Sequence, residues 1–271
     1  MTKIVGIRFK RAGLIYYFDP AGIEIEVGED VVVDTARGLS IGKAVTAPKE
    51  VDPGQLSEPL KPVLRKAQPD DLEQASKLQD IENTALGQCQ ELVDRFHLPM
   101  KLLSAEYNLD GSYLTIHFKS EKRVDFRALL RELSIALKTR VELRQVGTRD
   151  AAKLIGGIGG CGLPLCCKSH LSKFETISMK MAREQNLPLN PANISGLCGR
   201  LLCCLAYENE QYHVMKQKLP LVGQTINTRL GRGKVLGGNP LKETVTVQLE
   251  SEAVLELPLS ETTPCSSNNP Q

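Results

Sequence analysis

Cys-Gly-Leu-Pro-Leu-Cys-Cys at Cys161–Cys167 is repeated as Cys-Gly-Arg-Leu-Leu-Cys-Cys at Cys198–Cys204. Each heptapeptide reads Cys-Gly, three residues, then Cys-Cys, and the two contain six of the chain's eight cysteines. Thiolates are soft metal ligands, so a repeated cluster of thiols indicates iron–sulfur or zinc chemistry. The repeat also defines a cysteine-rich, cluster-binding region over residues 150–217, around which the rest of the chain is organised.

Six thiols exceed the four that one tetrahedral metal or one cubane cluster takes. Three allocations are open: one cluster with two thiols to spare, a Zn₂Cys₆ pair, or two clusters whose shells partner proteins complete. Neighbouring side chains of an extended backbone point to opposite faces. We therefore expect Cys166 and Cys167, like Cys203 and Cys204, to bind different iron atoms or different clusters. Packing cysteines and a strained vicinal-disulfide switch are the alternatives.

The cysteines and histidines outside the motifs are weaker candidates. Cys89 lies on the apolar stripe of an expected helix, so we expect it in a core. Cys265 lies in a polar tail and is interpreted as a stray thiol. His170 follows Cys167 by three residues and is considered as an extra ligand. Three further histidines show no ligand spacing, namely His97, His117 and His213.

Composition is that of a folded protein with two or three domains: 271 residues, 41% hydrophobic and 24% charged, with a net charge of +2. The first residues lack the apolar stretch of a signal peptide, and no apolar run approaches the length of a membrane span. We therefore expect a cytoplasmic protein, whose thiols stay reduced. A phosphate loop, a catalytic triad and paired carboxylates are all missing, so we expect no enzymatic activity.

Both ends of the chain show short β-type runs separated by glycine and proline, which predict small barrel-like modules over residues 1–50 and 218–258. The segment 27–38 is echoed by the segment 222–233, so we expect the two modules to be related. The runs expected to form strands are 4–9, 14–18, 23–27, 31–34 and 40–46 in the first module, and 233–236, 244–249 and 253–257 in the second.

Between the first module and the cysteine region, residues 51–69 contain four prolines and are interpreted as a linker. A helix is expected from Asp70 to about residue 96, with Asp70 and Glu73 as a capping box. Strands, a second helix and a last strand follow. The order α-β-β-α-β over residues 70–149 predicts a small α+β unit, close to a ferredoxin-like plan without its first strand. We expect the tail, 259–271, to fray.

Basic residues gather between residues 119 and 149, although acidic residues are interleaved with them. A solvated helix face is the simpler interpretation, and contact with RNA is the alternative. The residues are Lys119, Lys122, Arg123, Arg127, Arg131, Lys138, Arg140, Arg144 and Arg149.

The segments Gly160–Cys167 and Gly196–Leu205 resemble those of the bacterial RicT (YaaT) family, which has a PSP-type C-terminal domain. The resemblance extends over about residues 1–258. It implies a cytoplasmic regulator that joins RicA and RicF in a complex carrying [4Fe–4S] clusters and influencing RNase Y-dependent mRNA maturation. It also implies that the cluster ligands are Cys161, Cys166, Cys167, Cys198, Cys203 and Cys204.

The leading hypothesis is thus an α+β protein that acts as a non-enzymatic, cluster-bearing adaptor. Its rival is a zinc-stabilised RNA-binding module, in which the β modules and the basic helix contact RNA. A component of an electron-transfer enzyme is a third hypothesis. The first of these expects the two cysteine motifs to converge on iron and sulfide in the folded chain.

Overall fold

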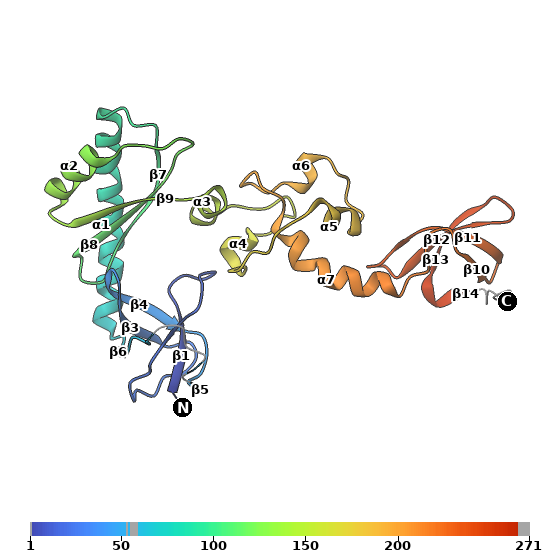
Figure 1. Cartoon of the computed structure of the whole chain (residues 1–271), viewed down its shortest axis with the longest axis horizontal. Coiled ribbons are helices and arrows are strands. Elements are labelled where there is room, and N and C mark those ends of the chain that lie inside the picture. The colour runs from blue at the N-terminus through green and yellow to red at the C-terminus, as the bar shows by residue number, and fades with distance from the viewer. Residues whose placement is uncertain (1, 53, 55–58, 265–271) are drawn as a thin grey trace. The chain divides into compact units, whose positions relative to one another are not determined.

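The computed structural model describes residues 2–52, 54 and 59–264 and has mixed α and β content with several sheets (Figure 1). The chain divides into two compact units. The first combines Met1–Phe174 with Gly196–Arg200, and the second combines Glu175–Ser195 with Leu201–Gln271. In the described part of the chain, no helix is both long and apolar enough to cross a lipid bilayer.

The first unit begins with a β module whose strands are β1 (Thr2–Arg8), β2 (Tyr16–Phe18), β3 (Asp30–Thr35), β4 (Gly38–Ala44), β5 (Lys49–Val51) and β6 (Val63–Lys66). The sheet order is β2-β1-β4-β3-β6, with β5 paired to the other end of β1. Ile4–Ile7 of β1 and Val31–Val33 of β3 are buried without a break, so both faces of these strands are covered. Val5, Ile7, Val31 and Val33 are fully buried and form the centre of its core.

The module differs from the sequence prediction in three places. Lys49–Val51 forms β5, which was not predicted as a strand. Residues 23–27 form no strand, although Ile25 is buried in the core. Residues 51–69, expected to be a linker, contain β6, whose Val63 pairs with Val33 of β3. Isolated apolar residues predict burial, but the pairing of strands depends on partners distant in sequence, which a local pattern does not reveal.

The second part of the first unit has the expected order α-β-β-α-β: α1 (Pro69–Arg95), β7 (Lys101–Tyr107), β8 (Tyr113–Lys119), α2 (Arg127–Leu137) and β9 (Arg140–Gln145). β7 and β8 are antiparallel, and β8 and β9 are parallel. Residues from both helices and all three strands share one core, with Cys89, Leu129, Leu133, Leu114, Ile116 and Phe118 at 0% exposure. α1 begins one residue earlier than predicted, and the backbone N–H of Gln68 donates to the Asp71 carboxylate at 2.8 Å. The capping residues are therefore Gln68 and Asp71, and not Asp70 and Glu73.

Polar contacts attach the β module to this α+β part within the same unit. The backbone N–H of Leu109 donates to Leu39 O at 2.8 Å, and Asn108 Nδ2 donates to Arg37 O at 3.0 Å. Lys10 forms an ion pair with Glu106. The loop after β1 and the turn between β3 and β4 are thus held against the sheet β7-β8-β9.

The cysteine-rich region contains α3 (Thr148–Ile155), α4 (Cys166–Ser169), α5 (Met179–Glu184), α6 (Pro191–Ile194) and α7 (Cys203–Gln217). Ala182, Ile194 and Leu205, one from each of the last three helices, form a small core. The C-terminal β module follows with β10 (Thr225–Thr228), β11 (Gly231–Asn239), β12 (Thr244–Leu249), β13 (Val254–Pro258), the short helix η2 (Leu259–Glu261) and β14 (Thr262–Pro264).

The C-terminal sheet has the order β13-β12-β11-β10-β14. Residues 259–264 were expected to fray, but Thr262–Pro264 pairs with β10 and completes the sheet. Cys265 lies outside the described residues.

Candidate metal centre

The first cysteine motif forms the tip of a short hairpin. Ile158 and Pro164 make an isolated antiparallel bridge. Inside it, the N–H of Gly159 donates to Leu163 O at 2.8 Å, and the N–H of Gly162 donates to Gly159 O at 2.9 Å. Gly162 has a φ of +80°, which side chains other than glycine rarely adopt. The glycine after the first cysteine is therefore required by the turn.

The second motif repeats this hairpin bond for bond, 37 residues later. Ser195 and Leu201 make the bridge. The N–H of Gly196 donates to Arg200 O at 2.8 Å, and the N–H of Gly199 donates to Gly196 O at 2.9 Å. Gly199 has a φ of +75°. The sequence repeat is therefore a structural repeat.

Each hairpin leads directly into a helix. Leu165 N–H donates to Gly157 O at 3.2 Å and Leu202 N–H donates to Ile194 O at 2.9 Å, and the next residue begins α4 or α7. The adjacent cysteines are thus the first two residues of a helix, and the extended backbone expected for them is wrong. The expected divergence of their side chains remains, because successive helical residues are about 100° apart.

The exposure of the thiols follows this placement. Cys161, in the turn, is exposed, whereas Cys167 is 6% exposed and belongs to the buried residues. The other four motif cysteines are half-buried: Cys198 in the second turn, Cys166 at the start of α4, and Cys203 and Cys204 at the start of α7.

The structure does not assemble these thiols into a metal site. Over residues 2–52, 54 and 59–264, no three side chains of His, Cys, Asp or Glu are grouped so that they could hold a metal ion. The division between the two units also passes through the second hairpin. Cys161, Cys166, Cys167 and Cys198 belong to the first unit, and Cys203 and Cys204 belong to the second. The expected convergence of all six thiols stays a prediction.

Within the first unit, the tip of the second hairpin contacts the base of the first. A Cβ atom on Gly157 would lie 3.3 Å from Leu197 Cδ1, and one on Gly147 would lie 3.9 Å from Arg200 Nη2. The residues on either side of Cys198 are therefore packed against the segment that leads into Cys161.

The two motifs differ in the helix that follows them. α7 has 15 residues, and the unpaired N–H groups at the start of a helix carry partial positive charge. Cys203 and Cys204 occupy that first turn, which contains no acidic residue. After the first motif, α4 is only four residues long. Its Lys168 Nζ donates to Leu154 O and Ile155 O at the end of α3, each at 3.2 Å.

The weaker candidates are placed as follows. Cys89 is buried in the core of the α+β part, as predicted, and burial raises the pKa of its thiol to about 12. His117 is also buried, 3.3 Å from Ser104 Oγ and 3.7 Å from Glu106 Oε1, and burial lowers its pKa. His170 Nδ1 lies 2.9 Å from Ser169 Oγ. None of these residues belongs to a three-ligand group in the described part of the chain.

Several residues of the predicted basic group are already engaged. Arg127 forms an ion pair with Asp125 at 2.6 Å. Arg140 lies over the Tyr113 ring and Arg149 lies over the Phe174 ring, at 5.5 and 4.6 Å from the centroids. The group is therefore dispersed over ion pairs and aromatic rings, and the geometry favours a solvated surface.

Comparisons with known proteins decide the family. Residues 61–146 match the PSP1 C-terminal conserved region, and residues 176–219 match the third domain of PSP1-like proteins. The chain is 45% identical over 257 residues to the stage 0 sporulation protein YaaT of Bacillus subtilis, an alignment that covers 94% of each chain. The chain belongs to the YaaT family of PSP1-type proteins.

A second relative is similar to about half of this chain. An uncharacterised Schizosaccharomyces pombe protein, PB7E8.02, is 30% identical over 165 residues, which are 51% of this chain and 22% of that protein. No solved structure matches this chain. The PSP1-like third domain comprises α5, α6, the second cysteine hairpin and α7, whereas the first cysteine hairpin lies between the two matched regions.

Sequence reasoning found the motif cysteines but missed the backbone around them. The residues before each motif, Gly157 and Ile194, accept the hydrogen bonds that close the two hairpins. Their identities differ, so nothing in the residue types marks them as equivalent. Only the constant spacing of 37 residues between the motifs would have predicted this pairing.

Proposed function

We propose that this chain is an iron–sulfur-cluster-binding regulatory subunit of a complex that modulates RNase Y-dependent mRNA maturation, without catalysis of its own. The repeated hairpin carries this proposal, because it presents three thiols in the same arrangement twice. Membership in the family of a protein named for stage 0 sporulation supports a regulatory role. By the same resemblance, the proposed partners are RicA-like and RicF-like proteins.

The number of thiols supports a shared site. Each hairpin contributes three, and a [4Fe–4S] cluster takes four. A fourth ligand must therefore come from the other hairpin or from a partner. Assembly of the complex would then depend on the supply of iron, as metal binding and folding are coupled in other small metal sites. When bound, the cluster would supply a redox-sensitive link between the elements that ligate it.

Apolar side chains beside the thiols support a site that a partner covers. Leu163 and Leu197 flank the first cysteine of each motif and are 65% and 67% exposed. Apolar cover around a cluster limits the access of water and tunes its potential. We propose that the partner supplies the rest of this cover.

Metal and sulfide analysis of anaerobically purified protein, with the partners co-expressed, tests the proposal. We expect brown protein that contains iron and acid-labile sulfide, and loss of both in the Cys167→Ser, Cys204→Ser double variant. Cys89→Ala is the matched control, because Cys89 is a core thiol outside the motifs, and its iron content should equal that of the wild type. Stoichiometric zinc without sulfide would reject the proposal and favour a zinc-stabilised module.

A further inference from the structure

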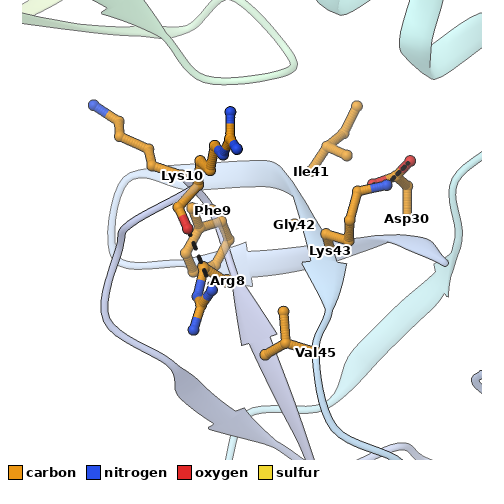
Figure 2. A pocket seen from close by; sticks show the side chains of 9 residues that line it. Arg8, Phe9, Lys10, Asp30, Ile41, Gly42, Lys43 and Val45 are labelled. Atoms are coloured by element: carbon orange, nitrogen blue, oxygen red, sulfur yellow. Dashed lines mark hydrogen bonds and ion pairs between the residues drawn. The ribbon is translucent and has the colours of Figure 1, made fainter. Parts of the chain in front are cut away.

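A cleft of about 470 Å³ opens on the N-terminal β module, within the size range of small-ligand sites (Figure 2). Four cationic side chains line it, those of Arg8, Lys10, Arg11 and Lys43, together with one carboxylate, that of Asp30. Four positive charges and one negative charge leave the lining with a net charge of +3. The cleft lies apart in sequence from the cysteine motifs and from the predicted basic group.

Two of the four cations are already paired. Lys43 Nζ lies 3.2 Å from the Asp30 carboxylate and 3.1 Å from Gly28 O, and Figure 2 shows this pair at one side of the cleft. Lys10 forms its ion pair with Glu106 of the neighbouring sheet. These contacts fix two walls of the cleft and neutralise most of their charge.

The other two cations keep unused binding capacity. Arg8 Nη1 donates to the carbonyl oxygen of Arg11 at 3.2 Å, which fixes the guanidinium group. Its Nε is buried and has no hydrogen-bond partner among the residues that the structure describes. Buried donors nearly always have a partner, so this N–H is an exception in the described part of the chain. Arg11 is exposed and forms no ion pair with any described residue.

Beside these cations, the cleft has an apolar side. Phe9, Ile41 and Val45 contribute to its lining. The Phe9 ring lies 5.7 Å from the ring of Tyr16, which is 51% exposed and lies beyond the lining residues. An aromatic surface therefore continues from the cleft onto the outside of β2. Guanidinium groups next to exposed aromatic rings are typical of surfaces that bind single-stranded nucleic acid.

We propose that this cleft binds a backbone phosphate of single-stranded nucleic acid, with Arg8 and Arg11 contacting the phosphate and the Phe9–Tyr16 ring pair contacting an adjacent base. An open cleft with an exposed ring beyond its edge suits a polymer, which continues past the site, better than a mononucleotide. The proposal does not depend on the cysteine motifs or on their metal.

The C-terminal module supplies a matched control. Gly42 and Lys43 of β4 correspond to Gly233 and Lys234 of β11, in the same position of a similar hairpin. Lys234 is exposed, but its cross-strand neighbour on β12 is Gln248, whereas that of Lys43 on β1 is Arg8. Lys234→Gln thus removes one positive charge from the chain without touching the cleft.

Fluorescence anisotropy of a labelled single-stranded RNA of about 12 nucleotides, titrated with the full chain, tests the proposal. Arg11→Gln keeps the backbone carbonyl that fixes Arg8, so the cleft should keep its shape. We expect this variant to weaken binding about fivefold or more and to lower the salt dependence of the affinity by about 0.7 in log–log slope. Tyr16→Ala should weaken binding about fivefold through lost stacking. Lys234→Gln should bind as the wild type does.

Three results would overturn the proposal. The first is unchanged affinity and salt slope in both Arg11→Gln and Arg8→Gln. The second is complete displacement of the RNA by micromolar AMP or inorganic phosphate, which would identify a site for a free phosphate compound. The third is tighter binding to phosphatidylserine vesicles than to RNA with the same loss in Arg11→Gln, which would identify a lipid headgroup as the ligand.

Discussion

The two β modules share a hairpin and use it differently. In the N-terminal module, the hairpin joins β3 to β4. Gly28 N–H donates to Ala44 O at 2.8 Å, and Ala44 N–H donates to Glu29 O at 2.9 Å. At the turn, Thr35 Oγ1 donates to Gly38 O at 2.8 Å. Gly28 and Gly38 have φ values of +100° and +94°, so glycine is required at both.

In the C-terminal module, the hairpin that joins β10 to β11 has the same bonds. Gly223 N–H donates to Val235 O at 2.8 Å, and Val235 N–H donates to Gln224 O at 2.9 Å. Thr228 Oγ1 donates to Gly231 O at 2.8 Å. The short echo in the sequence, 27–38 against 222–233, therefore corresponds to a repeated hairpin. The second hairpin is shorter, so its turn glycine equivalent to Gly38 is Gly231, and not Gly233.

What differs is the strand added beside the hairpin. In the N-terminal sheet, the strand beside β4 is β1, which ends in Arg8 and leads into the cationic loop. In the C-terminal sheet, the strand beside β11 is β12, whose Leu249 pairs with Gly233. The hairpin is thus a local unit defined by its glycines and threonine. The strand packed on it determines which surface the module presents.

The largest expected effect comes from the glycine where the added strand approaches. A Cβ atom at Gly42 would lie 2.4 Å from Ile7 Cγ2, and one at Gly233 would lie 2.3 Å from Val247 Cγ1 and 2.9 Å from Gln248 O. We expect Gly42→Ala and Gly233→Ala each to destabilise their own module by about 1–3 kcal/mol, through overpacking. The cost should be larger at Gly233, because the Gln248 carbonyl belongs to the backbone and cannot rotate away.

Hydrogen–deuterium exchange, resolved by peptide, measures the two effects separately in the full chain. Gly87→Ala is the control, since a Cβ atom there meets nothing within 4 Å in the middle of α1, and the variant should be neutral or slightly stabilising. If Gly42→Ala loosened both modules equally, they would not be independent local units, and the comparison would be wrong.

Elements with strong local patterns could be predicted from the sequence. The apolar spacing of α1 persists over 27 residues, and Asp110-Gly111 marks the turn between β7 and β8, where Gly111 has a φ of +71°. β6 was missed, because its only signal is pairing with β3, more than 25 residues away. β14 was missed for the same reason, as Thr262–Pro264 is a polar segment that depends on β10.

The candidate site likewise has one part that a local sequence pattern predicts and another that depends on contacts between distant residues. The spacing of cysteines and glycines predicted two equivalent motifs, because it reflects a local turn that glycine permits. The contact of Leu197 with the Gly157 segment was not predictable, because it is a tertiary contact between residues without periodic pattern. The cleft was missed for a similar reason. The run Arg8–Arg11 is visible in the sequence, but Lys43 and Ile41 reach the cleft from another strand.

A smaller effect is expected from the threonine that closes each turn. Besides its bond to glycine, each hydroxyl accepts a backbone N–H at 3.2 Å, from Arg37 in one module and Leu230 in the other. Thr35→Val should cost about 1 kcal/mol because its bonds are partly buried, and Thr228→Val should cost less because its bonds are exposed. Amide exchange at Arg37 and Leu230 measures both, and the Thr→Ser variants should behave as the wild type. A larger loss at Thr228 would contradict this ranking by burial.

The smallest expected effect is a pH dependence that only one hairpin possesses. The Glu29 carboxylate accepts the N–H of Glu26 at 2.9 Å, and the uncharged Gln224 accepts the N–H of Leu221 at 3.0 Å in the corresponding place. The hydrogen bond from Lys66, at 2.7 Å, and the bond from Glu26 hold the pKa of Glu29 below its ordinary value.

A carboxylate with a lowered folded-state pKa stabilises the fold above its unfolded pKa of about 4.3, and the benefit is lost as the pH falls through the folded value. We therefore expect the protection of the Glu26 amide to fall on acidification below about pH 4, while that of the Leu221 amide stays constant. Amide exchange followed by NMR across this range measures the two sites in one sample. Glu29→Gln should make the N-terminal hairpin as insensitive to pH as the C-terminal one, because it gives both hairpins the same uncharged acceptor. Equal pH dependence of the two amides in the wild type would show that the charge of Glu29 does not stabilise its hairpin.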